Sequence, residues 1–275
     1  MRLTVWGSRG SLASAGPETI RYGGNTPCVQ IEGADGSVLV LDAGTGIRRA
    51  GLALAGDRRP IHVLLTHLHM DHVQGLGFFR PLFEPGREVH IWGPPSTTQD
   101  LRARLTRYLS PPLFPVRIRD LTSHPELHDV HADPWSVGGF NITAAGVVHP
   151  GPTVGYRIEE AGATIAYVPD HEPALGGPLS APQWLSGYGL ARDVDILLHD
   201  GQYTDEEYRQ RVGWGHSSIS HALQVADLSQ ARDLVLIHHD PDHTDDQIDD
   251  LVENAGRARR TGTVRGAREG MVLEV

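Results

Sequence analysis

The stretch that decides the fold is His67-Leu68-His69-Met70-Asp71-His72, which follows the mostly apolar residues 61–66. An apolar run of that length predicts a buried strand, so the histidines stand in the loop at its end. His67 and His69 are alternate residues and can direct both imidazoles to one point. Asp71 and His72 can reach a second point nearby. Because imidazole nitrogens and carboxylates are the ligands that zinc and related divalent ions prefer, this run predicts a metal site.

One such run cannot close two metal sites, so further ligands are expected downstream. Four ligand-type residues come directly after predicted strands or apolar runs: His149, Asp170, His238 and His239. Each of them alone could as well be a surface group or a hydrogen-bonded core group. Their shared position after strands predicts that they complete the site, and the residues themselves leave both His238 and His239 open.

Hydrophobic patterning predicts an α/β protein. Strands are predicted at residues 3–7, 29–32, 38–41, 61–66, 90–93, 140–144, 154–158, 164–168, 195–198 and 234–237, and helices near 47–54, 99–108 and 218–228. Residues 110–135, rich in proline and histidine, are predicted to be irregular. Each half of the chain carries strand hairpins and then a buried strand with ligand-type residues after it. This rhythm predicts two β-sheets packed face to face with helices outside, in a single domain spanning 1–275.

Composition and charge restrict the classes of function. Of the 275 residues, 39% are hydrophobic and 21% are charged, as in an ordinary globular protein. The formal net charge of −10 argues against a protein that grips long nucleic acid by its phosphates. It permits a small anionic substrate, because divalent metals supply a positive field locally. With Cys28 as the single cysteine, no signal-peptide core and no membrane-length apolar run, we expect a cytoplasmic protein without membrane contact.

Several motifs identify a family resemblance. Four of them are Leu41-Asp42-Ala43-Gly44, Thr66-His67 through His72, His149 with Gly155-Tyr156-Arg157-Ile158-Glu159, and Tyr167-Val168-Pro169-Asp170. Together they resemble the motifs of the metallo-β-lactamase superfamily, and specifically of its phosphodiesterase branch, which includes tRNase Z. Three later stretches resemble segments of that branch: Asp195-Ile196-Leu197-Leu198-His199-Asp200, Gly215-His216-Ser217-Ser218 and Leu234-Val235-Leu236-Ile237-His238. The resemblance covers nearly the whole chain.

The resemblance implies an αββα sandwich of two mixed β-sheets, with two divalent metal ions at one sheet edge. Zn²⁺ is the ion expected first, and Mn²⁺ is the alternative. The implied ligands are His67, His69 and His149 for the first metal, Asp71, His72 and His238 for the second, and Asp170 as the bridge. Asp42 would orient a ligand from behind. The Leu-Ile-His pattern of the branch favours His238 over His239.

For catalysis, the resemblance implies that a hydroxide held between the metals attacks a phosphodiester in line with its leaving oxygen. His216, poised by Asp200, would be the general acid that protonates the leaving oxygen. Asp71 would be essential to the reaction centre as a ligand. A second interpretation stays open, in which His216 merely precedes a helix that Ser217 and Ser218 cap.

The chain departs from tRNase Z in ways that bear on its substrate. Between Glu159 and Pro169 there is no room for the long arm that grips tRNA in that enzyme. The chain also has Asp200-Gly201 where Glu-Ala is expected, and His171 where threonine is usual. With the acidic net charge, these differences argue against a tRNA substrate.

A closer resemblance is to the cyclic-nucleotide phosphodiesterases of bacteria and phages. These include enzymes that degrade cyclic pyrimidine nucleotides to blunt defence signalling (anti-Pycsar enzymes). The features that carry it are Trp6-Gly7-Ser8-Arg9-Gly10-Ser11, Arg21-Tyr22-Gly23-Gly24-Asn25-Thr26, Asp170-His171-Glu172 and His238-His239-Asp240-Pro241. It implies hydrolysis of a 3′,5′-cyclic nucleotide to a 5′-nucleotide, usually by a homodimer. From the acidic charge and the missing arm we expect no stable binding of nucleic acid. The loop at Gly23-Gly24-Asn25-Thr26 could meet the substrate or be a plain tight turn.

Three other functions remain open on the sequence. The first is RNA 3′-end processing of the tRNase Z type. The second is hydrolysis of a carbon ester, thioester or lactam, which the same fold supports elsewhere; His216 and its Gly-His-Ser-Ser segment argue against it. The third is a binding module that keeps its metals for stability, and a complete ligand set with an acid beside it argues against that.

Overall fold

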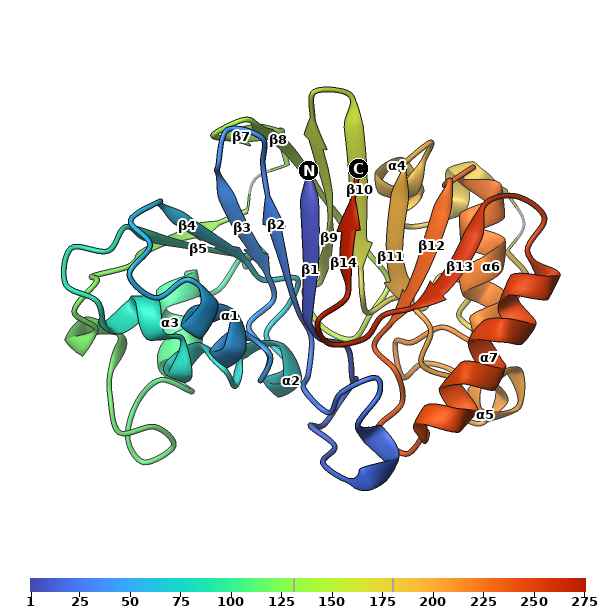
Figure 1. Cartoon of the computed structure of the whole chain (residues 1–275), viewed down its shortest axis with the longest axis horizontal. Helices are drawn as coiled ribbons and strands as arrows, with labels where there is room; N and C mark the ends of the chain where they lie inside the picture. The colour runs from blue at the N-terminus through green and yellow to red at the C-terminus, as the bar shows by residue number, and fades with distance from the viewer. Residues whose placement is uncertain (131, 180) are drawn as a thin grey trace.

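Two β-sheets packed face to face form the centre of the molecule (Figure 1), in a computed structural model that describes residues 1–130, 132–179 and 181–275. The first sheet has seven strands in the order β14-β1-β2-β3-β4-β5-β6, and the second has seven in the order β13-β12-β11-β10-β9-β8-β7. Both sheets are mixed: β1–β2 is antiparallel and β3–β4 parallel in the first, and β9–β10 is antiparallel and β10–β11 parallel in the second. The predicted sandwich of two mixed sheets is confirmed.

The strand bounds follow the predicted runs closely. The first sheet contains β1 (Arg2–Gly7), β2 (Cys28–Glu32), β3 (Val38–Leu41), β4 (Ile61–Leu64), β5 (Val89–Gly93), β6 (Glu126–Asp129) and β14 (Val272–Glu274). The second contains β7 (Trp135–Val137), β8 (Phe140–Gly146), β9 (Val154–Glu160), β10 (Ala163–Val168), β11 (Ile196–Asp200), β12 (Asp233–Ile237) and β13 (Thr263–Gly266).

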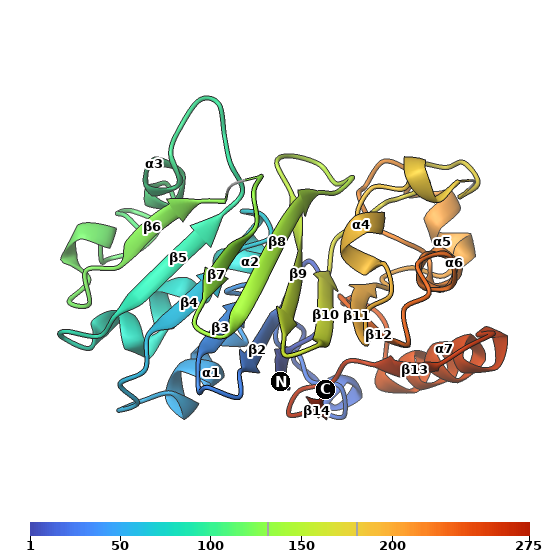
Figure 2. The same cartoon turned by 90° about the horizontal axis from the view of Figure 1, so that it is seen from above.

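Helices cover the outer face of each sheet (Figure 2). They are α1 (Ile47–Ala53), α2 (Met70–Val73), α3 (Leu101–Thr106), α4 (Tyr188–Ala191), α5 (Asp205–Arg209), α6 (Ile219–Leu228) and α7 (Asp245–Ala258). Short 3-10 helices occupy Pro17–Thr19, Leu76–Phe78, Arg80–Phe83, Ile118–Asp120 and Pro182–Trp184. Helix α1 packs on β1 and β2, whereas α6 packs on β11 and β12. In the part of the chain that the structure describes, none of the helices combines the length and apolarity needed to cross a bilayer.

The continuous apolar strands are explained by burial on both faces. In β3, Leu39 and Leu41 point into the core between the sheets, while Val38 and Val40 lie in a second apolar cluster with α1. In β11, Ile196 and Leu198 face the same central core, and Leu197 faces a third cluster. A strand covered on both faces needs apolar residues at every position, not at alternate ones.

The strand directions place the site. Because β3 runs parallel to β4, and β10, β11 and β12 run parallel to one another, their carboxyl ends meet at common sheet edges. The residues that leave these ends are Asp42, His67, Asp170, Asp200 and His238. Chain segments that are far apart in sequence therefore converge at one end of the sandwich.

The hairpin between β9 and β10 is as short as the sequence predicts. Its two turn residues, Ala161 and Gly162, have φ angles of 51° and 91°. Two positive φ angles in a two-residue loop are the conformation that matches the twist of a hairpin. The chain passes from β9 directly into β10, and Asp170 follows two residues after β10 ends, with no insertion between the two strands.

Several parts of the fold differ from the predictions or were not predicted, among them the strand β7 and the short helices α2, α4 and α5. Residues 110–135 are not wholly irregular, since β6 pairs in parallel with β5; residue 131 lies outside the described residues. With Leu127 as the one aliphatic residue in Glu126–Asp129, β6 has little hydrophobic signal, and edge pairing supplies its order. Helix α7 and the strands β13 and β14 also escaped prediction. Helix α7 begins with a capping box at Thr244. The residues of this helix are mostly polar because only one of its faces packs against the protein.

Candidate metal centre

A first group of donors is formed by His67, His69 and His149. Their ring nitrogens lie close enough to one another to hold a single ion. The Nε2 atom of His149 is 3.1 Å from Nδ1 of His69. The Nε2 atoms of His67 and His149 are each 3.7 Å from Oδ2 of Asp170. The structure thus brings together three histidines that come from the ends of β4 and β8.

A second group is formed by Asp71, His72 and His238. The Nε2 atom of His238 lies 3.1 Å from Asp71 Oδ2 and 3.3 Å from His72 Nε2. Asp170 adjoins this group too, since its Oδ1 is 3.1 Å from His72 Nε2 and its Oδ2 is 3.4 Å from His238 Nε2. Asp170 therefore stands between the two groups, where the sequence analysis expected the bridging carboxylate.

Hydrogen bonds behind the histidines direct their inner nitrogens toward the cluster. The Nδ1 atom of His72 lies 2.8 Å from Asp42 Oδ2, that of His149 lies 2.7 Å from the Gly215 carbonyl, and that of His238 lies 3.1 Å from Gln202 Oε1. An acceptor on one ring nitrogen fixes the proton there and leaves the other nitrogen as a lone pair. Three inner nitrogens are therefore set up as ligands and not as hydrogen-bond donors.

Asp42 is the anchor of this arrangement. Its carboxylate accepts from the backbone and hydroxyl of Thr66 at 2.7 and 3.0 Å and from the hydroxyl of Tyr167 at 3.0 Å. Because the Thr66 hydroxyl gives its one proton to Asp42, it can only accept from Nδ1 of His67, 3.1 Å away. Asp42 itself has a φ of 58°, an uncommon backbone conformation for a non-glycine residue, as expected where function constrains the chain.

The cluster leaves buried lone pairs that a cation would satisfy. Among the described residues, Nε2 of His67 and Oδ1 of Asp170 are buried and have no hydrogen-bond partner. Burial lowers the pKa of both His67 and His149, which keeps them neutral as ligands. For His72, burial opposes the charged form, but the nearby carboxylates outweigh it and raise its pKa in the metal-free chain. Nitrogen and carboxylate donors in this arrangement fit divalent metal ions.

His216 and Asp200 form a pair beside the cluster. Nδ1 of His216 lies 2.8 Å from Oδ2 of Asp200, and the ring stacks on that of His238 with centroids 4.8 Å apart. Asp200 also accepts from the backbone amides of His171 and Gln202, at 3.1 and 3.0 Å, so its carboxylate is fixed. Burial opposes protonation of His216, but the charge and hydrogen bond of Asp200 raise its pKa on balance. The pair is built to hold a proton next to the candidate metal ligands.

The alternative prediction for the His216 segment describes a real feature as well. The side chain of Ser218 accepts from the His221 amide and caps helix α6. Ser217 instead donates to the His171 carbonyl at 2.6 Å. Capping and the contact with Asp200 occur together, so a helix start next to His216 does not remove it from the site.

Three residues at the site carried no predicted role. The Ser11 amide donates to Asp71 Oδ2 at 2.8 Å, and Gln202 orients His238 while donating to the Ser11 hydroxyl at 3.2 Å. Glu172 accepts from the amides of Gly213 and Gly215 at 2.8 and 2.7 Å and so holds the loop that carries His216. Ser11 and Glu172 lie in motifs that the sequence singled out, but their targets are far away in the chain.

Two glycines are required by close approach. A Cβ on Gly10 would lie 2.3 Å from Nδ1 of His238. Gly215 has a φ of 92°, and a Cβ there would lie 2.4 Å from Nδ1 of His149. At both positions the backbone passes directly behind a predicted metal ligand, where no side chain fits.

Two alternatives from the sequence are placed away from the cluster. Nε2 of His239 donates to the Ala267 carbonyl at 2.9 Å, so the structure brings His238 and not His239 to the other donors. In the Gly-Gly-Asn-Thr loop, the backbone and side chain of Asn25 both donate to Glu269 Oε1, at 2.8 and 2.9 Å. These contacts favour the tight-turn interpretation of that loop.

Comparisons with known proteins point to one family. Residues 38–239 match the model of a family described as the Beta-lactamase superfamily domain. A protein named Ribonuclease Z from Myxococcus xanthus is 27% identical over 285 aligned positions, which cover 88% of this chain and 90% of the relative.

Solved structures share the whole fold. The metallo-beta-lactamase fold protein YhfI from Bacillus subtilis superposes with a TM-score of 0.73 at 19% identity, over 99% of both chains. A structure described as a new diphosphatase from the PhnP family superposes with a TM-score of 0.70 at 21% identity, over 100% of this chain and 97% of the other. At these identities the likeness bears on the fold alone.

Proposed function

The chain belongs to the metallo-β-lactamase superfamily, and from this premise we propose that it is a two-metal phosphodiesterase that hydrolyses 3′,5′-cyclic nucleotides to 5′-nucleotides. The observation that carries the proposal is the His216–Asp200 pair, which adjoins two complete groups of metal donors. Hydrolysis of an ester with a stable leaving anion does not need such an acid, whereas release of a ribose alkoxide does.

The donors divide naturally between two ions. His67, His69 and His149 would hold one ion, and Asp71, His72 and His238 the other, with an Asp170 oxygen available to each. Two such ions would supply Lewis acidity for the phosphoryl oxygens and acidify a water molecule at neutral pH. The mixture of imidazole and carboxylate donors suits Zn²⁺ best, with Mn²⁺ as the alternative.

The protein's own residues provide the proton and the alignment. The Nδ1 atom of His216 is occupied by Asp200, so Nε2 is the atom that would deliver a proton to the leaving oxygen. Asp42, Gln202, Gly215 and Ser11 hold the donor residues in place from behind. Such outer contacts fix ligand orientation before substrate arrives.

Two features of the chain favour a small substrate over a large nucleic acid. The β9–β10 connection is a two-residue turn, and the net charge is −10. A protein that binds tRNA needs an extended positive surface to meet its phosphates. We include a homodimer in the proposal, which the mass of the purified protein in solution would test.

A second candidate function is RNA 3′-end processing. It is favoured by the relative named Ribonuclease Z, which aligns over most of this chain. The same two groups of donors would serve that reaction, so the substrate alone distinguishes the two functions.

The test is a substrate panel given to purified, zinc-loaded protein. It contains the cyclic mononucleotides, cyclic dinucleotides, bis-p-nitrophenyl phosphate and a precursor tRNA, with Asp71→Ala as the inactive control. We expect turnover of at least one cyclic mononucleotide and none in the control. Inertness toward all cyclic mononucleotides would overturn the proposal, and precursor cleavage at low enzyme concentration would promote the second candidate.

A further inference from the structure

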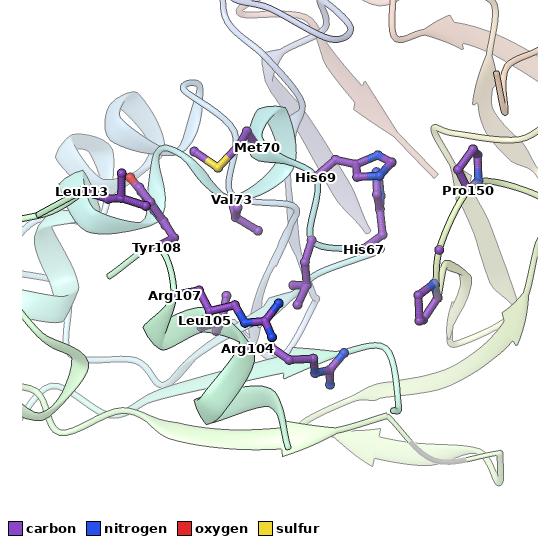
Figure 3. Close-up of a pocket in the computed structure, with 13 residues that line it drawn as sticks. His67, His69, Met70, Val73, Arg104, Leu105, Arg107, Tyr108, Leu113 and Pro150 are labelled. Carbon is purple, nitrogen blue, oxygen red and sulfur yellow. The ribbon is translucent and has the colours of Figure 1, made fainter. Parts of the chain in front are cut away.

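We propose that the apolar cavity next to the first group of donors is a nucleobase pocket, with Arg107 as its recognition residue. The cavity has a volume of about 370 Å³ and is lined by His67 and His69 at one side, so it opens directly onto the proposed metal centre (Figure 3). The inference rests on the proposed function, because it assigns the part of the substrate that lies next to the scissile phosphate.

The cavity wall is suited to a flat, weakly polar group. Its apolar lining comes from Leu105 and Tyr108 near helix α3, from Met70 and Val73 near α2, and from Leu113. Met70 and Leu113 are 53% and 71% exposed and line the same cavity, so they present apolar surface beside the donors. Binding sites for small molecules combine such apolar walls with a few polar groups.

The size of the cavity also favours a mononucleotide. Pockets for small ligands run from about 300 to 1,000 Å³, and this one lies near the lower limit. A base with its sugar fits that space, while the adjoining phosphate would reach His67 and His69. The lining residues include no aspartate or glutamate, so nothing there repels an anionic ligand.

The two arginines of the cavity have different roles. Arg104 donates to the Pro94 carbonyl at 2.7 Å and to Asp129 Oδ1 at 2.8 Å, which ties α3 to the end of β6. Arg107, at the end of the same helix, is exposed, and its side chain makes no hydrogen bond or ion pair with any of the described residues. In Figure 3, Arg104 and Arg107 lie on one side of the labelled histidines, and Pro150 lies on the opposite side.

A guanidinium group without a protein partner is suited to recognise a base. It offers donors alone, and nucleobases carry carbonyl oxygens and ring nitrogens that accept. Arg107 would donate to that edge while the base lies against Leu105 and Tyr108. The pocket thereby selects for the presence of a base and not merely for a phosphodiester.

The test measures binding, so that it does not depend on turnover. Zinc-loaded protein is titrated with uridine and adenosine 5′-monophosphates and with ribose 5-phosphate, which lacks the base. We expect at least one nucleotide to bind about tenfold or more tightly than ribose 5-phosphate, and Arg107→Ala to remove that advantage. Affinity for ribose 5-phosphate should stay unchanged in the variant.

Matched variants separate recognition from folding. Arg102→Ala removes an exposed arginine from the same helix outside the cavity and should leave all affinities unchanged. Leu113→Glu should weaken nucleotide binding, whereas Leu52→Glu, at a half-exposed leucine of α1, should not.

The outcomes for the pocket and for the enzyme are distinct. Nucleotide affinities that do not change in Arg107→Ala and Leu113→Glu overturn the pocket, even in a protein that hydrolyses cyclic nucleotides. If nucleotide affinity falls in both variants but the wild-type protein does not hydrolyse cyclic nucleotides, the pocket is supported and the proposed function is overturned. A wild-type protein that prefers no nucleotide over ribose 5-phosphate also overturns the pocket.

Discussion

Replacing His216 by asparagine should slow the reaction by an amount that depends on the leaving group. Nδ1 of His216 is held 2.8 Å from Asp200, which is itself fixed by two backbone amides. The ring is therefore oriented to deliver a proton from Nε2. A ribose 3′-alkoxide needs that proton to leave, whereas p-nitrophenolate is a stable anion and does not.

The expected magnitudes follow from this difference. General acid catalysis contributes about 10²–10⁴-fold, so kcat for a 3′,5′-cyclic nucleotide should fall by that factor in His216→Asn. For bis-p-nitrophenyl phosphate the loss in kcat should stay below about tenfold, because its leaving group does not need a proton from a general acid. Asp200→Asn keeps the imidazole but removes a charged hydrogen bond of about 1.5–3 kcal/mol, which corresponds to a loss of about 10–150-fold on the cyclic nucleotide.

The assay compares both substrates in one preparation of known metal content. Metal analysis is needed because the His216 ring stacks on His238 and its Nδ1 is 3.9 Å from Asp170. His221→Asn, a half-buried histidine of α6 that packs on Tyr208, is the control for loss of an imidazole. If both substrates slow equally while the metal content is unchanged, His216 is not the general acid.

Three further changes test the supporting structure. Gly215→Ala would place a Cβ 2.4 Å from His149 Nδ1 at a φ of 92°, so zinc affinity should drop about 10–100-fold in a competition titration; affinity equal to wild type would contradict the packing. Arg9→Leu leaves the buried Asp245 without its ion-pair partner at 3.1 Å and should lower the free energy of unfolding by about 3–5 kcal/mol in urea. Arg21→Ala removes an exposed guanidinium and should cost much less; equal losses would count against the buried ion pair. Burial, with a smaller contribution from His90, lowers the pKa of His62 from its ordinary 6.5 to about 4. As the pH falls, His62 is therefore protonated in the unfolded chain before it is protonated in the folded one. The free energy of unfolding thus decreases as the pH falls from about 6.5 toward 4. In His62→Asn the free energy of unfolding should therefore decline less between about pH 7 and pH 5, and an undiminished decline would assign the effect to other groups.

The convergence of the candidate donors can be predicted from the sequence because they lie in short motifs at strand ends. His67 to His72 are adjacent in the chain, and His149, Asp170 and His238 each follow a strand with a clear apolar pattern. Parallel pairing then brings those ends together. The geometry places His238, which the Leu-Ile-His pattern favoured, and not His239 beside Asp71.

The supporting contacts were beyond sequence reasoning. Ser11 with Asp71, and Gln202 with His238, are paired by the fold over long stretches of chain, and no local pattern shows which residue is the partner of which. Helix α7 escaped notice for a different reason. Its fourteen residues are mostly polar because most of its surface faces solvent, so hydrophobic periodicity is weak and the capping box at Thr244 is the main local signal.

The proposed activity is tested most directly by ³¹P NMR of a 3′,5′-cyclic nucleotide incubated with zinc-loaded protein in H₂¹⁸O. We expect a nucleoside 5′-monophosphate as the sole product, with one ¹⁸O on phosphorus, and no product with Asp71→Ala. A 3′-monophosphate, or no turnover by protein that carries two metals per chain, would contradict the proposed activity.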